Sequence, residues 1–76
     1  MKITDLHHTE IGATMMCGKA MDESGHRYSF CATREGVVFG VFKEDPSQVV
    51  GDGLTFWESV KAPPALRKVV RKAVAT

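Results

Sequence analysis

The segment Asp22–Phe42, with the sequence DESGHRYSFCATREGVVFGVF, contains two turn signals between runs of β-forming residues. Asp22-Glu23-Ser24-Gly25 and Thr33-Arg34-Glu35-Gly36 each end with glycine in the fourth position. This pattern is typical of a type I turn followed by a residue in the left-handed region, which glycine adopts without a steric penalty. The two turns predict three antiparallel strands, at about residues 11–21, 26–33 and 37–43.

The positions of the two turns also predict which residues face each other. The first hairpin pairs Cys17 with Cys31, and the second pairs Tyr28 with Phe42 and Phe30 with Gly40. We expect a core face that carries Met16, Gly18, Ala20, Tyr28, Phe30, Ala32, Val38, Gly40 and Phe42. The opposite face, which we expect to be partly exposed, carries Met15, Cys17, Lys19, Met21, Arg27, Ser29, Cys31, Phe39, Val41 and Lys43. A slip of one residue would exchange the two faces.

The segments on either side of these strands are less clearly patterned. Residues 1–10 fit either a helical turn, from the spacing of Ile3 and Leu6, or a short first strand, and we expect their tip to be mobile. Residues 45–54 are predicted to form a connector, because Asp45-Pro46-Ser47 breaks the third strand. Within this connector, Val49-Val50 is a candidate for a short edge strand.

The C-terminal part of the sequence predicts helix. Thr55-Phe56-Trp57-Glu58 fits a capping box, and Pro63-Pro64 interrupts the helix that would begin there. From Pro64 onward, apolar residues recur at helical spacing, at Leu66, Val69, Val70, Ala73 and Val74. We therefore predict an α+β fold, in which a three- or four-stranded antiparallel β-meander is followed by a helical segment. This segment, residues 55–75, is broken at Pro63-Pro64 and packs on one sheet face.

The chain length and composition limit the class of protein. With 76 residues, of which 43% are hydrophobic and 25% are charged, the chain suits a single small globular domain spanning residues 1–76. It contains no apolar run long enough to cross a membrane, and residues 1–8 lack the apolar core of a secretory signal. We therefore expect a cytoplasmic protein with no membrane partner. Domains of this size are marginally stable alone, so we also expect a homodimer.

The charge distribution indicates an anionic partner. The net charge is +1, but all nine acidic residues lie before residue 59, whereas residues 61–76 contain five basic residues and no acid. Arg67 and Arg71, and likewise Lys68 and Lys72, are spaced four apart on the helix face opposite the apolar stripe. Two alternatives stay open. In one, the basic segment folds back on the acidic body, and in the other, the helix face is simply solvated.

We therefore predict a small, non-enzymatic nucleic-acid-binding or regulatory protein that uses this basic helix face. Trp57 can stack on the bases of a single strand, with packing in the core as the alternative. The candidate binding residues are Arg67, Lys68, Arg71, Lys72, Lys61, Arg27, Lys43 and Trp57. The second hypothesis is a protein-interaction module, an adaptor or inhibitor of an acidic protein, that uses the uncovered sheet face together with the basic helix.

Catalytic and metal sites are not indicated. Cys17 and Cys31 are expected to be two reduced thiols, with a labile disulfide as the alternative. His26 lies near the far end of the strand from Cys31, so that no Cys–His pair is complete. The sequence lacks Cys-x-x-Cys and the histidine spacing typical of zinc sites. We therefore predict no enzymatic activity, no metal and no cofactor.

Overall fold

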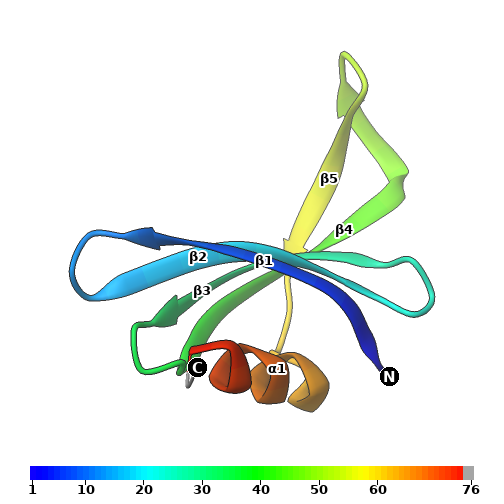
Figure 1. Cartoon of the computed structure of the whole chain (residues 1–76). Helices are drawn as coiled ribbons and strands as arrows, with labels where there is room; N and C mark the ends of the chain where they lie inside the picture. The colour runs from blue at the N-terminus through cyan, green and yellow to red at the C-terminus, as the bar shows by residue number, and fades with distance from the viewer. Residues whose placement is uncertain (75–76) are drawn as a thin grey trace.

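Five antiparallel strands form a single sheet, in which each strand pairs with its neighbour in the sequence (Figure 1). The computed structural model describes residues 1–74, except for the side chain of residue 50. The strands are β1 (Ile3–Ile11), β2 (Met15–Asp22), β3 (Arg27–Thr33), β4 (Val38–Gly51) and β5 (Leu54–Ser59), and the helix α1 (Pro64–Val74) follows them. The predicted α+β class and antiparallel meander are confirmed, but the sheet has five strands rather than three or four.

The first additional strand is β1, which resolves the ambiguity of residues 1–10. It pairs with β2 from Ile3, opposite Asp22, to Ile11, opposite Met15. Within β1 only Ile3 and Leu6 are half-buried, and the other side chains are exposed. The alternative of a helical turn is therefore wrong, because pairing of the backbone with β2 outweighs the helical spacing of two apolar residues.

The second additional strand is β5, where the sequence predicts the start of a helix. Asp52 and Gly53 have positive φ angles of 44° and 79° and form a two-residue turn between β4 and β5. An Asp-Gly pair suits this type I′ turn, whose twist matches that of the flanking strands. The predicted helix from Thr55 is therefore wrong. The Thr55 hydroxyl donates a hydrogen bond to the Glu44 carboxylate instead of capping a helix.

β4 continues through the predicted connector. Asp45-Pro46-Ser47 shifts the register without ending the strand, since the pairing with β5 resumes at Val49. Proline is tolerated at such irregular positions of a ladder. Residues 45–56, which we call the projecting hairpin, extend away from the rest of the sheet on the side opposite α1 (Figure 1). Val49-Val50, predicted as a short edge strand, is part of β4 in this hairpin.

The helix begins only after the first proline of the Pro63-Pro64 pair. α1 starts at Pro64, and residues 60–63 have no regular structure. The predicted break is therefore the beginning of the helix, a position that suits proline because its missing N–H needs no partner there. Residue 75, the predicted end of the helical segment, lies outside the described residues. Among the described residues, no helix combines the length and the hydropathy that crossing a membrane requires.

A β-bulge changes the register of the second hairpin. Ala32 pairs with Val38, but Cys31 pairs with Gly40, so that Phe39 is an extra residue in β4. Beyond the bulge, each residue of β3 faces a residue one position further along β4 than the turn spacing predicts. A bulge of this kind places two residues of one strand opposite one residue of the other.

The bulge exchanges the two faces of β4 beyond it. Val41 pairs with Phe30 and is 3% exposed, whereas Phe42 is 45% exposed. The predictions of Phe42 in the core and of Val41 on the exposed face are therefore wrong. Gly40 and Lys43 change faces for the same reason. An alternating pattern cannot reveal such a change, because one extra residue reverses the alternation.

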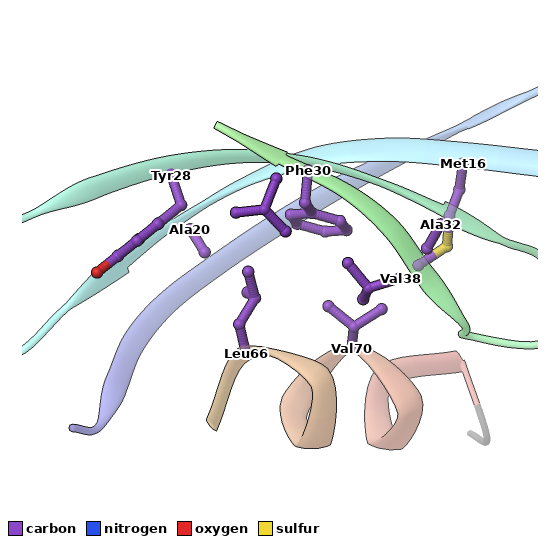
Figure 2. Packing of buried hydrophobic residues seen from close by; sticks show 9 residues of the cluster. Met16, Ala20, Tyr28, Phe30, Ala32, Val38, Leu66 and Val70 are labelled. Carbon is purple, nitrogen blue, oxygen red and sulfur yellow. The ribbon is translucent and has the colours of Figure 1, made fainter. Parts of the chain in front are cut away.

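The core lies between α1 and one face of the sheet (Figure 2). Leu66 and Val70 are fully buried and point from α1 toward the sheet, where Phe30 and Val38 lie. Burial of each such side chain contributes about 1.5–3 kcal/mol. The predicted packing of the apolar helix stripe on the sheet is confirmed. The buried hydrophobic residues are Met16, Ala20, Tyr28, Phe30, Ala32, Val38, Val41, Leu66 and Val70.

Candidate functional site

The predicted binding residues separate onto two sides of the sheet. Four of them lie on the side of α1 that faces away from the sheet, and we call Arg67, Lys68, Arg71 and Lys72 the basic helix surface. The side of the sheet that α1 does not cover, which we call the open sheet face, carries Cys17, Lys19, Arg27, Ser29, Cys31, Phe42 and Trp57. No single flat surface therefore contains all of the predicted residues.

The inward stripe of α1 determines the position of the basic helix surface. Because Leu66 and Val70 are buried against the sheet, residues 67, 68, 71 and 72 turn outward and are exposed. The first turn of α1 contains no acidic residue. Arg71 and Lys72 lie in the last turn, where the helix dipole favours positive charge. The fold thus holds four cations together on one face of a well-anchored helix.

None of these four cations has an acidic partner within residues 1–74. The ion pairs in this part of the chain join Glu44 to Arg27, Glu10 to Arg34, and two aspartates to histidines. The alternative in which the basic segment folds back on the acidic body has no support from these contacts. The charges of the basic helix surface are therefore available to an external anion.

Lys61 extends the basic helix surface. It is exposed just before α1, and with Arg67 it lines a shallow depression of about 200 Å³ beside β4. A second depression, of about 330 Å³, is lined by Pro64, Arg67, Lys68 and Arg71. The structure therefore brings five of the predicted residues together along one continuous surface.

Arg27 is neutralised within the protein. Its Nε donates to Glu44 Oε1 at 2.7 Å, and its Nη2 donates to Glu44 Oε2. The Thr55 hydroxyl donates to the same carboxylate at 2.7 Å. These bonds, first from Arg27 and then from Thr55, hold the pKa of the buried Glu44 below its usual range, and the pair raises the pKa of Arg27. Arg27 thus links β3 to β4 and contributes no free charge to a binding surface.

Lys43 does not lie on the open sheet face, where the sequence predicts it. The bulge at Phe39 places Lys43 opposite Tyr28, on the face that packs against α1. Lys19 keeps its predicted place in β2 and is exposed on the open sheet face. The predicted continuation of positive charge from the helix through Arg27 and Lys43 is therefore not formed.

Trp57 lies in β5 and is half-buried. With Lys19, Ser29 and Phe42 it lines a shallow depression of about 310 Å³ on the open sheet face. An aromatic ring beside a cation suits the stacking of planar groups. This depression and the basic helix surface lie on opposite sides of the sheet, so one straight strand of nucleic acid cannot contact both.

Two further features are not predicted from the sequence. The projecting hairpin exposes Val49, Leu54 and Phe56 at 64%, 66% and 38%. The Asp52-Gly53 pair is the signal that identifies it, because this dipeptide favours two-residue hairpin turns. The second feature is the buried Glu44, whose partners lie on two other strands and leave no local signal.

Asp22 forms a polar cluster at the turn between β2 and β3. Its carboxylate, 5% exposed, accepts hydrogen bonds from the backbone N–H groups of Ser24 and His26, at 2.9 and 3.0 Å, and from the Tyr28 hydroxyl, at 3.1 Å. Burial raises the pKa of Asp22, but these hydrogen bonds outweigh burial and leave the pKa below its usual value. The bonds fix the turn and saturate the carboxylate, so we assign this cluster a structural role.

Among residues 1–74, no three His, Cys, Asp or Glu side chains are grouped closely enough to hold a metal ion.

Comparison with known proteins does not identify the function. No protein-family model, curated protein or solved structure matches the chain. The function must therefore be inferred from the surfaces themselves.

Proposed function

We propose that the protein is a small, non-enzymatic nucleic-acid-binding protein and that the basic helix surface, extended by Lys61, contacts the phosphate backbone. The observation that carries this proposal is the group of four exposed cations on one face of α1, none of which has an acidic partner within residues 1–74. Contacts of this kind depend on phosphate charge more than on base sequence.

The like charges on α1 favour an anionic ligand. Arg67 and Arg71, and likewise Lys68 and Lys72, are like-charged pairs that destabilise an isolated helix by roughly 0.2–0.5 kcal/mol each. Burial of Leu66 and its neighbours holds the helix in place despite this repulsion. A polyanion relieves the repulsion and releases its own counterions on binding, which is the main source of sequence-independent affinity.

A matched pair of variants tests the proposal. Anisotropy titrations with a labelled single strand and a labelled duplex, each at two salt concentrations, give the affinity and its salt dependence. Lys68→Gln with Lys72→Gln removes two charges from the basic helix surface, whereas Lys2→Gln with Arg34→Gln removes two exposed charges elsewhere. The affinity of the helix variant should be about tenfold lower than that of the wild type. The magnitude of its slope of log K against log salt should be smaller by about 1.4–1.8. The control variant should change neither quantity.

Two results would reject this surface. An equal loss in both double variants would show that net charge drives binding, wherever the charge lies. Absence of binding to either probe at low salt would exclude nucleic acid as the partner, because sequence-independent affinity is greatest there.

The projecting hairpin supports a second candidate function, a protein-interaction module. Val49, Leu54 and Phe56 are each at least 38% exposed, although they are large and apolar. Such side chains are typical of protein contact surfaces when they gather on one part of a molecule. The basic helix would then bind an acidic protein. A labelled polyglutamate peptide tests this alternative. The protein-interaction function would be favoured if the protein bound this peptide as tightly as an oligonucleotide of equal charge and if the helix variant lost this affinity.

A homodimer stays a prediction. β5 is an edge strand of the sheet and carries the exposed Leu54, so that pairing of two hairpins would bury apolar surface. Sedimentation velocity on the wild type and on Leu54→Ser tests this mode of association. A dimer that the variant weakens would support it, and a wild-type monomer at high concentration would exclude it.

A further inference from the structure

Cys17 and Cys31 face each other within the β2–β3 pair, as the turn spacing predicts. Their Sγ atoms are 2.6 Å apart, and both side chains are half-buried on the open sheet face. A disulfide requires about 2.0 Å between its two sulfur atoms. The two thiols are thus within reach of a covalent bond without any change of strand register.

The backbone at this pair has the spacing that a disulfide requires. The turn bond from the Asp22 N–H to the His26 carbonyl oxygen, 3.0 Å long, marks a hydrogen-bonded pair, and the two kinds of pair alternate from there. Cys17 and Cys31 therefore form a non-hydrogen-bonded pair, whose Cα atoms lie about 4.5 Å apart. Disulfides occur at Cα separations of about 4.4–6.8 Å, so this pair lies within the allowed range.

A depression beside Cys17 gives a reagent access to the thiol. It has a volume of about 430 Å³, and His7, Thr9, Lys19 and Ser29 are among the residues that line it. Lys19 is exposed and lies on the same face as Cys17, two positions along β2. A positive charge at this place attracts anionic reagents, and a low-molecular-weight disulfide with carboxylate groups, such as oxidised glutathione, belongs to this class.

The two thiols differ in their expected roles. The hydrogen bond with Cys17, followed by burial and the charge of Cys17, raises the pKa of Cys31 to about 11. Cys31 therefore stays protonated while Cys17 is free. Attachment of an external sulfur to Cys17 removes its hydrogen bond and its charge, so that Cys31 ionises more easily at that stage. The depression is lined by Cys17 and not by Cys31, so we assign Cys17 as the attacking residue and Cys31 as the resolving residue.

We propose that Cys17 and Cys31 form a dithiol site that exchanges with a low-molecular-weight disulfide to give a cross-strand disulfide. The Cys17 thiolate attacks one sulfur of oxidised glutathione, and the first glutathione leaves as its thiolate. The Cys31 thiolate then attacks the Cys17 Sγ in the mixed disulfide and displaces the second glutathione. The protein is oxidised by two electrons, the reagent is reduced, and the two protons from the cysteines end on the two glutathione thiols.

The disulfide has a consequence for stability that does not depend on nucleic-acid binding. It closes a loop between residues 14 positions apart, which restricts the unfolded chain more than the folded one. For a domain of this size we expect the melting temperature to rise by about 10–20 °C.

The test uses the full chain, reduced and then incubated at graded ratios of reduced to oxidised glutathione. Intact mass spectrometry should show a loss of about 2 Da, and peptide mapping without reductant should link Cys17 to Cys31. The oxidised protein should melt about 10–20 °C higher than the reduced protein. Cys31→Ser should accumulate a stable glutathione adduct at Cys17. Cys17→Ser should form its adduct at Cys31 several-fold more slowly, because the depression that admits the reagent is lined by Cys17 and not by Cys31. Circular dichroism of both variants checks that they fold.

Three results would overturn the proposal. The first is wild-type protein that carries glutathione on both cysteines without a cross-link. The second is a disulfide between two chains on a non-reducing gel. The third is wild-type thiols that stay reduced under conditions that modify Cys17 in Cys31→Ser. Equal rates of adduct formation in the two serine variants would overturn the assigned order of attack.

Discussion

Phe30 packs over Gly18 across the β2–β3 ladder and leaves no room for a side chain at position 18. A Cβ there would lie 2.8 Å from Phe30 Cζ and would also overlap the backbone carbonyl oxygen of His7. Phe30 is fully buried, and His7 belongs to a strand that is hydrogen-bonded to β2, so neither neighbour can move freely. Gly18 therefore sets how closely β1 approaches β2 and where the Phe30 ring lies in the core.

Gly18→Ala should destabilise the protein by about 2–3 kcal/mol, because the added methyl group overpacks the core and pushes on the β1 backbone. Gly40→Ala is the matched control, since Gly40 also lies in a strand but a Cβ there meets no atom within 4 Å. Urea denaturation followed by Trp57 fluorescence should show a lower midpoint for Gly18→Ala alone. Wild-type stability of Gly18→Ala would contradict this packing.

The bulge at Phe39 leads to a second prediction, on the faces of β4. Val41→Ala should cost about 2 kcal/mol, because Val41 is 3% exposed and its truncation leaves a small cavity. Phe42→Ala should cost no more than about 1 kcal/mol, although it removes more atoms, because Phe42 is 45% exposed. Thermal denaturation of the two variants gives the comparison. The opposite ranking would restore the unbulged register that the turn spacing predicts.

The features predicted correctly from the sequence depend on neighbours in the chain. The turn at Asp22–Gly25 sets the register of β2 and β3, which places Cys17 opposite Cys31 as predicted. The apolar stripe of α1 follows from helical spacing alone, and so does the outward direction of the basic helix surface. The strongest candidate site was therefore predictable without knowledge of the tertiary structure.

The features predicted wrongly depend on partners far away in the sequence. An extra residue at Phe39 has no signature in the alternating pattern, yet it moves Lys43 to the other face of the sheet. Arg27 was predicted as a binding cation, but its charge is neutralised by Glu44, which only the β3–β4 pairing brings near. The capping-box pattern predicts Trp57 at a helix start, but the Asp52-Gly53 turn before it pairs the segment with β4, so that Trp57 lies in a strand.

The ion pair of Arg27 with Glu44 should stabilise the protein more than the pair of Arg34 with Glu10. The Glu44 side chain is 7% exposed, whereas that of Glu10 is 61% exposed. Loss of the arginine partner therefore leaves an uncompensated buried charge at Glu44 but not at Glu10. Arg27→Met should therefore lower the denaturation midpoint clearly, whereas Arg34→Met should change stability by about 0–1 kcal/mol. Chemical denaturation at neutral pH measures both variants. Equal, small effects would contradict a stabilising role for the Arg27 pair.

Asp22 should make stability depend on pH in the acid range. The carboxylate accepts three well-aligned hydrogen bonds, and its pKa in the folded protein lies below the ordinary value of 3.8. The unfolded chain therefore takes up a proton at Asp22 at a higher pH than the folded protein does. The contribution of Asp22 to stability is complete above about pH 5, declines as the pH falls through 3.8, and is lost below the folded-state pKa.

Asp22→Asn should consequently be less stable than the wild type at pH 7, because the charged acceptor of these hydrogen bonds is lost. The free energy of unfolding of this variant should also decline less steeply between about pH 5 and pH 3. Glu44, whose pKa is also lowered, contributes to the decline in both proteins. Glu23→Gln removes an exposed carboxylate from the same turn and controls for the change in net charge. Urea denaturation across this pH range measures the slopes. Parallel curves for the wild type and Asp22→Asn would show that the Asp22 cluster does not couple folding to protonation.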